Sequence, residues 1–206
     1  RLGRRLFNGE LSPELVDQMR AYRVSKKTAE TICFDRLLEE RDLREVFERR
    51  KSDVLVYMAS QQFDRARRYS KLSARLKGDI KVGWGNYANV ENEARRLLFS
   101  VADQEVIDEA CENVLDDELG YMLPKFQLQF NVANLTRLPL PLRCYVACAS
   151  VLYGDVEDAD LIKIHSRSRK LSLMTYENFE GKLPVLKKRV KIDLKSQKVS
   201  IYEYDY

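Results

Sequence analysis

The spacing of apolar residues changes once along this 206-residue chain, and that change constrains the fold more than any other feature. Before Gly154, apolar residues recur every three or four positions, which is the period of an amphipathic helix. After Gly154 they alternate with polar residues, which is the period of a half-buried strand. We therefore predict an α+β protein, mostly helical over its N-terminal three quarters and closed by a small C-terminal antiparallel β-sheet of two hairpins.

The helical part carries start and stop signals. Ser12 and Ser25 are suited to cap helices, and Pro13 suits a first helical turn. DVLVYMASQQF (53–63) predicts a core helix, and RARRYSKLSARLKGDIK predicts one basic helix. An acidic helix and a proline-led helix ending at Gly154 follow. These patterns predict a helical segment (1–63), a helical core with the basic helix (64–155), and hairpins packed on the helices (156–206), together forming one structural unit.

The first hairpin contains His165, the only histidine of the chain. DLIKIH and KLSLMTY alternate across SRSR, and RVKIDL and VSIYEY alternate across KSQK. Ile162 and Ile164 therefore fall on one face of the first strand, and Lys163 and His165 on the other. A half-buried hairpin produces such a polar face by default, so a structural role for His165 stands beside a binding role.

The chain shows no reaction centre, and we predict no catalytic residue and no metal site. It has no glycine-rich phosphate loop, no Gly-x-Ser-x-Gly elbow and no glycine-rich turn of the kind that binds S-adenosylmethionine. It also has no run of eighteen apolar residues, so we expect no membrane span. The cysteines form no Cys-x-x-Cys pair and are expected to be buried free thiols, which suits a cytoplasmic location. They are Cys33, Cys111, Cys144 and Cys148.

One weak enzyme pattern remains. VKIDLK places Asp193 and Lys195 at the spacing that magnesium-dependent nucleases use, and Asp158 or Asp160 would be the further carboxylate. Short matches of this kind arise often by chance, so a nuclease is the least favoured alternative.

The charge is distributed in three blocks. Residues 1–100 carry 22 Lys and Arg against 15 Asp and Glu, residues 101–160 carry 3 against 12, and residues 161–206 carry 11 against 5. Basic blocks around an acidic one indicate either an anionic partner or internal salt pairing. The acidic block could also dock another protein.

Clustered cations near aromatic residues favour phosphate binding, because each neutralised phosphate releases counterions. One cluster is the stripe Arg67, Arg68, Lys71 and Arg75, and the other is the loop Arg167, Arg169 and Lys170. The basic tract 187–198 adds further cations, and Tyr69, Trp84 and Tyr176 could stack on bases. The alternative is that these charges are solvated or protect edge strands. The residues predicted to contact DNA are Arg67, Arg68, Lys71, Arg75, Lys163, His165, Arg167, Arg169 and Lys170.

Several stretches resemble the C-terminal part of the methyltransferase family associated with DNA phosphorothioation. They are LKGDIKVGWGNY (76–87), LLF (97–99), the helix ending LYG, the strand ADLIKIH and the tail MTYENFEGKLPVLKKRVKIDL. The resemblance covers about residues 53–200.

This resemblance implies a bacterial defence or DNA-modification setting, in which a methyltransferase domain that binds S-adenosylmethionine precedes the region seen here. We expect no cofactor in this chain, and its start at Arg1 suggests a processed chain or an excised piece. The leading hypothesis is a region that binds DNA and positions the target for the methyltransferase. The alternative is a protein-interaction module that docks the methyltransferase domain or another defence subunit through the acidic segment 101–120.

Overall fold

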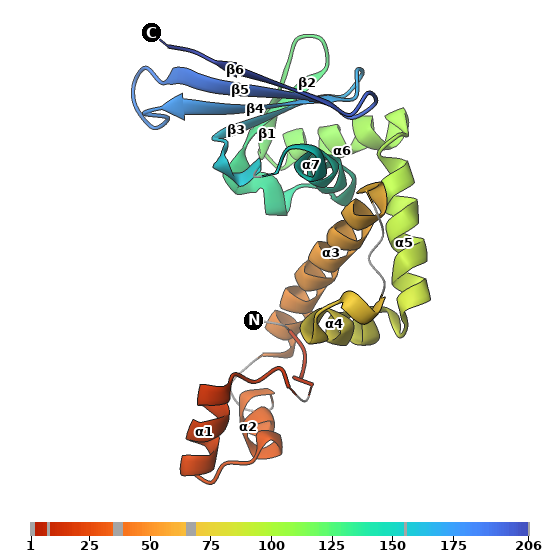
Figure 1. Ribbon diagram of the computed structural model, residues 1–206, viewed down its shortest axis with the longest axis vertical. Coiled ribbons are helices and arrows are strands. Elements are labelled where there is room, and N and C mark those ends of the chain that lie inside the picture. Colours follow the sequence, from red (N-terminus) through yellow and green to blue (C-terminus); the bar gives the residue numbers. More distant parts are fainter. Residues whose placement is uncertain (1–2, 8, 35–38, 65–68, 155, 206) are drawn as a thin grey trace. The chain divides into compact units, whose positions relative to one another are not determined.

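The structure, a computed structural model, describes residues 3–7, 9–34, 39–64, 69–154 and 156–205. The chain is α+β, with helices through most of its N-terminal part and strands toward its C-terminus, as predicted (Figure 1). It divides into two compact units: unit 1 comprises Arg1–Met58 and Arg67–Glu93, and unit 2 comprises Ala59–Ala66 and Ala94–Tyr206. No helix of the described residues combines the length and apolar character needed to cross a membrane.

Unit 1 is helical, and its predicted caps are present. Ser12 Oγ accepts a hydrogen bond from the Leu15 N–H, and Ser25 Oγ accepts one from the Thr28 N–H. The helices that lie wholly or partly in unit 1 are α1 (Pro13–Ala21), α2 (Lys26–Ile32), α3 (Glu40–Asp64), η2 (Tyr69–Lys71), α4 (Ala74–Trp84) and α5 (Tyr87–Ser100).

The prediction of one continuous basic helix over 65–81 was wrong for residues 69–81, the part that the structure describes. η2 ends at Lys71, and α4 starts only at Ala74, because Ser73 adopts an extended conformation and caps the new helix by accepting from the Leu76 N–H. Serine competes well for backbone donors at such positions, and that local bond outweighs continuation of the helix. Leu72 and Ile80 still become buried, as their spacing predicted.

Unit 1 is held together internally by a buried ion network. Arg4 and Asp79 are almost fully buried and form a 2.7 Å hydrogen bond from Nε to Oδ1. Arg4 also bonds both carboxylate oxygens of Glu10, and Arg50 Nε donates to Asp79 Oδ2 at 2.9 Å. The network joins the N-terminal segment to α3 and α4.

Unit 2 contains the antiparallel sheet. Among the described residues six strands pair in sequence order, each with the next. They are β1 (Gly120–Leu123), β2 (Gln127–Asn131), β3 (Leu161–His165), β4 (Lys170–Glu177), β5 (Val185–Asp193) and β6 (Lys198–Glu203). The two hairpins predicted from alternation are β3–β4 and β5–β6.

The hairpin β1–β2 is an addition that the sequence analysis assigned to the helical part. Polar and apolar residues alternate in QLQFN, but burial does not, because Gln129 is buried together with Leu128 and Phe130. The strand β2 pairs with β3, from which it is separated by the 29 residues 132–160. A strand this short becomes stable only through that distant partner, which explains why its local pattern was a weak signal.

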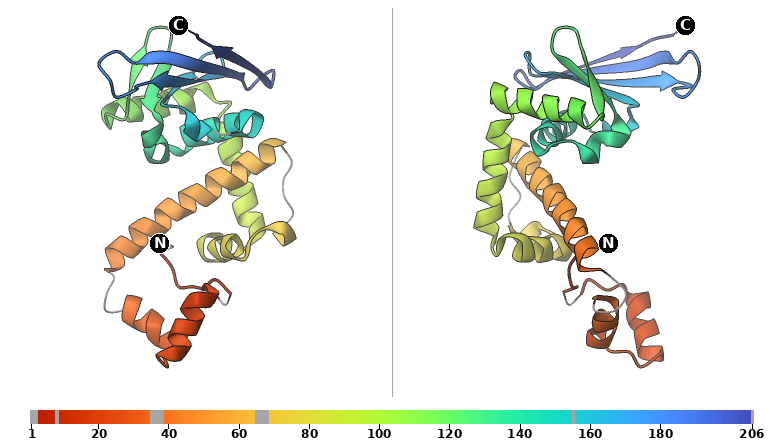
Figure 2. Two further views of the ribbon diagram at one scale, coloured as in Figure 1. Left: turned by 60° about the vertical axis from the view of Figure 1, so that its left-hand side comes forward. Right: turned by 180° about the vertical axis from the view of Figure 1, so that it is seen from behind.

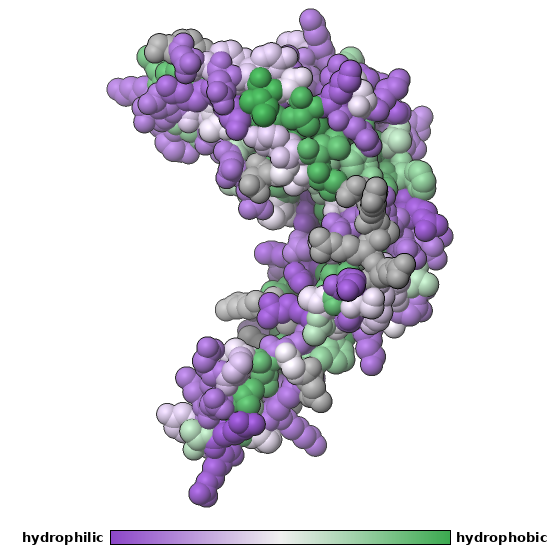
Figure 3. Space-filling model, in the orientation of Figure 1, coloured by the Kyte–Doolittle hydropathy of each residue, from purple (hydrophilic) through white to green (hydrophobic). Residues whose placement is uncertain are grey.

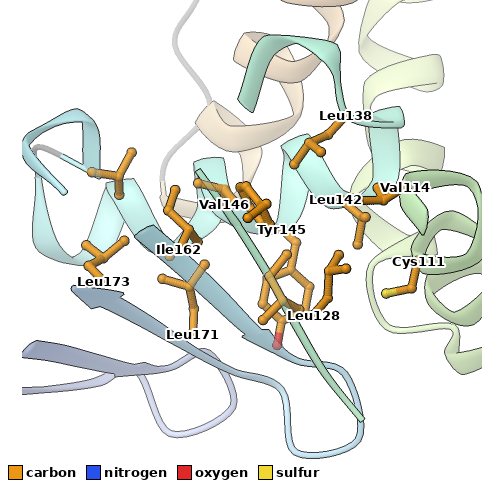
Figure 4. Close-up of a cluster of buried hydrophobic side chains, with 14 of the residues drawn as sticks. Cys111, Val114, Leu128, Leu138, Leu142, Tyr145, Val146, Ile162, Leu171 and Leu173 are labelled. Atoms are coloured by element: carbon orange, nitrogen blue, oxygen red, sulfur yellow. The ribbon is translucent and has the colours of Figure 1, made fainter. Parts of the chain in front are cut away.

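The helices α6 (Gln104–Asp116) and α7 (Leu140–Tyr153) cover one face of the sheet. Figures 1 and 2 show both helices on the same side of the strands. Tyr145 and Val146 of α7 meet Ile162, Ile164 and further strand residues in one apolar cluster (Figure 4). The cluster is a layer of helix on sheet, and it fixes which strand face stays open.

The proline-led helix ends where predicted. Gly154, at φ +104°, follows the last residue of α7 and caps it, a backbone conformation that glycine adopts without steric cost. Cys111, Cys144 and Cys148 are buried free thiols, as expected, whereas Cys33 is exposed. Burial raises the pKa of the Cys111 thiol to about 11, so this sulfur stays protonated and unreactive.

Candidate nucleic-acid interface

The side chains on the strand face opposite α6 and α7 form the candidate site, which we call the open face. The alternation of side chains along each strand and the register between strands determine which residues belong to the open face, because paired residues point to the same side of the sheet. Gln129, Lys163, Ser172 and Lys191 pair in one row across β2 to β5. In the adjacent row His165 pairs with Lys170, and a third row pairs Met174 with Arg189 and Arg189 with Tyr202.

Cations from three neighbouring strands surround His165 on the open face. Burial, followed by Lys163, Arg189, Lys191 and Lys170 in that order, lowers the pKa of His165 to about 4. Burial and the charge of Arg189 likewise lower the pKa of Lys163. Burial is the first cause of both pKa shifts, and the neighbouring cations add to it. The strand register itself holds Lys163, Lys170, Arg189 and Lys191 on one side of the sheet, which gives the open face a concentrated positive potential.

His165 itself is neutral near pH 7 because of this environment. Its Nε2 lies 3.1 Å from the hydroxyl of Ser172, which is fully buried. The imidazole therefore lies among the cations as a polar spacer rather than as a further charge. A phosphate placed beside the lysines would favour its protonated form.

Arg189 has one unsatisfied donor on this face. Its Nε is buried and has no hydrogen-bond partner among the described residues. Buried N–H groups are nearly always paired in folded proteins, so the guanidinium is short of an acceptor where it stands.

The carboxylate of Asp193 also lies on the open face, because Asp193 pairs with Lys170 in the register of β4 and β5. Its Oδ2 lies 3.5 Å from Lys170 Nζ, while its Oδ1 accepts hydrogen bonds from the backbone N–H groups of Lys195 and Ser196. The hydrogen bond from Ser196 is the largest of the effects that lower the pKa of Asp193. Its oxygens thus close the β5–β6 turn and partly neutralise Lys170.

These contacts also bear on the nuclease hypothesis. Asp160, one of the candidate partner carboxylates, accepts a hydrogen bond from the Tyr176 N–H. Within the described ranges no group of three or more His, Cys, Asp or Glu side chains is arranged to hold a metal ion. The geometry of the described residues therefore gives a magnesium nuclease no support.

The tip of the first hairpin is bound to the helical side of unit 2. Arg167 pairs with Asp108 of α6 at 3.0 Å and lies 4.6 Å from the ring centre of Phe126. Arg169 donates to the carbonyl of Ala102 at 3.1 Å. Salt pairing between the charge blocks, which was the alternative to an anionic partner, therefore occurs at Arg167. Arg167 and Arg169 attach the hairpin to the helical side and do not add to the open face.

The predicted DNA-contacting residues consequently fall into separate groups. Lys163, His165 and Lys170 share the open face of unit 2. Lys71 and Arg75 are exposed in unit 1, on η2 and in the first turn of α4. Arg67 and Arg68 lie outside the described residues.

Two cations of the open face were not singled out by the sequence analysis. Arg189 and Lys191 appeared there only as part of the basic tract 187–198. Their alternation with Val190 and Ile192 was a usable signal, because both apolar residues are buried and both cations must face the other way. The order of the strands, which brings β5 next to β4 and β3, was not readable from spacing alone.

The surface around the strands is mostly hydrophilic. In Figure 3 the visible side of unit 2 shows predominantly polar residues at the end that carries the strands, with a short apolar stretch beside them.

Comparisons of the chain with protein-family models, curated proteins and solved structures found no match. The functional conclusion therefore depends on the residues and geometry of the open face.

Proposed function

We propose that this chain is an accessory DNA-binding region whose open face contacts phosphates and positions DNA for a methyltransferase domain. The observation that carries the proposal is the group of cations on adjacent strands around His165, with Asp193 as the carboxylate among them. Lys163, Arg189 and Lys191 supply charge without an ion pair on the open face among the described residues. Phosphate contacts of this kind position a nucleic acid without reading its sequence.

The methyltransferase setting comes from the family resemblance. The stretches that carry the resemblance include ADLIKIH and the tail that contains KKRVKIDL, and these are the strands β3 and β5 that bear the cations. A region that holds DNA beside a modifying domain needs no cofactor of its own. S-adenosylmethionine would be bound by that other domain.

The proposal predicts a strong salt dependence of DNA binding. Contact with roughly three to four phosphates gives a plot of log affinity against log salt with a slope of about −3. The measurement is fluorescence anisotropy of a labelled oligonucleotide between about 50 and 200 mM salt. A flat response, or no binding at low salt, would contradict the proposal.

A matched pair of variants locates the binding surface. Arg189→Gln combined with Lys191→Gln should weaken binding by about tenfold or more and reduce the salt slope by about 2, because each cation contributes about one phosphate contact. Lys182→Gln removes an exposed charge from the β4–β5 connection, outside the paired rows of the open face, and should change neither. Equal losses in both proteins would indicate a diffuse effect of net charge.

A second candidate function is supported by the acidic face of α6 and the turn after it. Asp108 is engaged by Arg167, but the other acidic side chains of this segment point to solvent. The exposed acids are Glu105, Glu109, Glu112, Asp116, Asp117 and Glu118. A continuous exposed acidic strip is suited to dock a basic protein surface.

This second function makes a separate prediction. Reversing the charge of Asp116, Asp117 and Glu118 to lysine should abolish capture of a methyltransferase domain of the resembled family in a pull-down at low salt, while DNA binding is unchanged or stronger. Retention of the domain by the charge-reversed protein would remove the acidic segment as a docking surface.

A further inference from the structure

Aromatic rings border the cations of the open face. Tyr121 lies on the edge strand β1, in the same row as Gln129 and Lys163, and it is 50% exposed. Tyr202 lies on the other edge strand, β6, opposite Arg189, and it is 44% exposed. Each ring therefore offers a large accessible surface beside the positive charges.

Neighbouring groups support both rings in place. The Gln129 side-chain amide donates a hydrogen bond to the Tyr121 hydroxyl, and Gln129 is itself buried on this face. Lys191 Nζ lies 5.2 Å from the ring centre of Tyr202, a cation–π contact. An ordered aromatic ring costs less conformational entropy when it binds a flat partner.

We propose that the open face binds unpaired nucleotides, with phosphates on Lys163, Arg189 and Lys191 and bases stacked on Tyr121 and Tyr202. This inference rests on the proposed function and specifies its ligand as single-stranded nucleic acid. Every base has a flat π-face, so stacking on tyrosine tolerates any sequence. In a duplex those base faces are already stacked, and the two tyrosines would have no partner.

The size of the open face fits a short single strand. β1 and β6 are five strand spacings apart, which is about 24 Å at about 4.8 Å per strand. That width suits a segment at the short end of the range of about 4 to 16 nucleotides bound by single-strand-binding folds. An enzyme that modifies a base must also take it out of the stack, so a neighbouring grip on unpaired nucleotides would assist that step.

Three ligands of equal length test the inference with the whole chain. They are a mixed-sequence single strand of about 12 nucleotides, the same strand made abasic so that it keeps its phosphates, and the 12-base-pair duplex. We expect the normal strand to bind about 10- to 100-fold more tightly than the abasic strand, because stacking is lost with the bases. It should also bind more tightly than the duplex.

Variants of the tyrosines assign that difference to the open face. Tyr121→Leu combined with Tyr202→Leu should reduce affinity for the normal strand by about 5- to 100-fold and leave the abasic strand unaffected. The corresponding Tyr→Phe changes keep the rings and should retain binding. Tyr22→Leu, at an 80% exposed position at the end of α1, is the matched control. Circular dichroism checks that every variant is folded.

The outcomes separate the two proposals. Equal affinity for normal and abasic strands, tighter binding of the duplex, or full binding by the leucine double variant overturns the single-strand inference and leaves DNA binding in place. Failure of all three ligands to bind, under conditions where the protein is folded, overturns the proposed function itself.

Discussion

At the residue scale, His165 reports on the charge of the open face. It is the only histidine of the sequence, so the Hε1 proton of its ring gives one resolved NMR signal. We predict titration near pH 4 in the free protein, well below the ordinary value of about 6.5, because burial and the surrounding cations disfavour the imidazolium. Bound nucleic acid should raise the pKa, since phosphates offset Lys163, Lys170, Arg189 and Lys191. A signal titrating near 6.5 in the free protein would contradict the partly buried, cation-rich environment of His165.

The same pKa shift affects stability with a definite sign. Between about pH 6.5 and 4 the unfolded chain binds a proton at His165 that the folded protein does not, so the free energy of unfolding falls on acidification. Because the ring is partly exposed, we expect a loss of only about 1 kcal/mol between pH 7 and pH 5. His165→Gln should remove this part of the pH dependence in urea unfolding.

Asp79 makes a residue-scale prediction for unit 1. Its carboxylate is 2% exposed and accepts from Arg4 at 2.7 Å and Arg50 at 2.9 Å. Asp79→Ala leaves guanidinium groups without a counterion in a buried site, which should cost about 3–5 kcal/mol in the free energy of unfolding. Asp17→Ala, which removes an exposed pair with Arg20, should cost less than about 1 kcal/mol. Similar losses in both variants would contradict the role of burial.

At the scale of the elements, the β1–β2 hairpin contributes most to the candidate site beyond the predicted strands. It widens the sheet on the β3 side and brings Tyr121 and Gln129 into the row of Lys163. Gly120 permits the close pairing, since a Cβ there would stand 2.7 Å from the carbonyl oxygen of Gln129. The short strand β1 therefore tolerates only glycine at its start without a shift of its neighbour.

At the scale of the whole molecule, the charge blocks have different roles in the folded chain. The acidic block supplies α6, whose Asp108 neutralises Arg167 of the C-terminal basic block. Lys163, Lys170, Arg189 and Lys191 of that basic block lie on the strand face that α6 and α7 do not cover. Layering helices on one side of the sheet thus separates like charges from their counterions and produces a one-sided electrostatic surface.

Local patterns determined the α+β class, the caps at Ser12 and Ser25, the stop at Gly154 and the two C-terminal hairpins. Each of these depends on residues within a few positions of one another, where the backbone hydrogen bonds or the alternation of side chains are set. The same patterns placed Lys163 and His165 on the polar side of their strand.

Only the tertiary structure decided which cations act together. It paired β2 with β3 and β4 with β5, which put Arg189 and Lys191 beside Lys163, and it turned Arg167 and Arg169 toward the helical layer. The physical reason is that strand order is set by burial of apolar faces against α6 and α7, a long-range free energy that residue spacing along the chain does not contain.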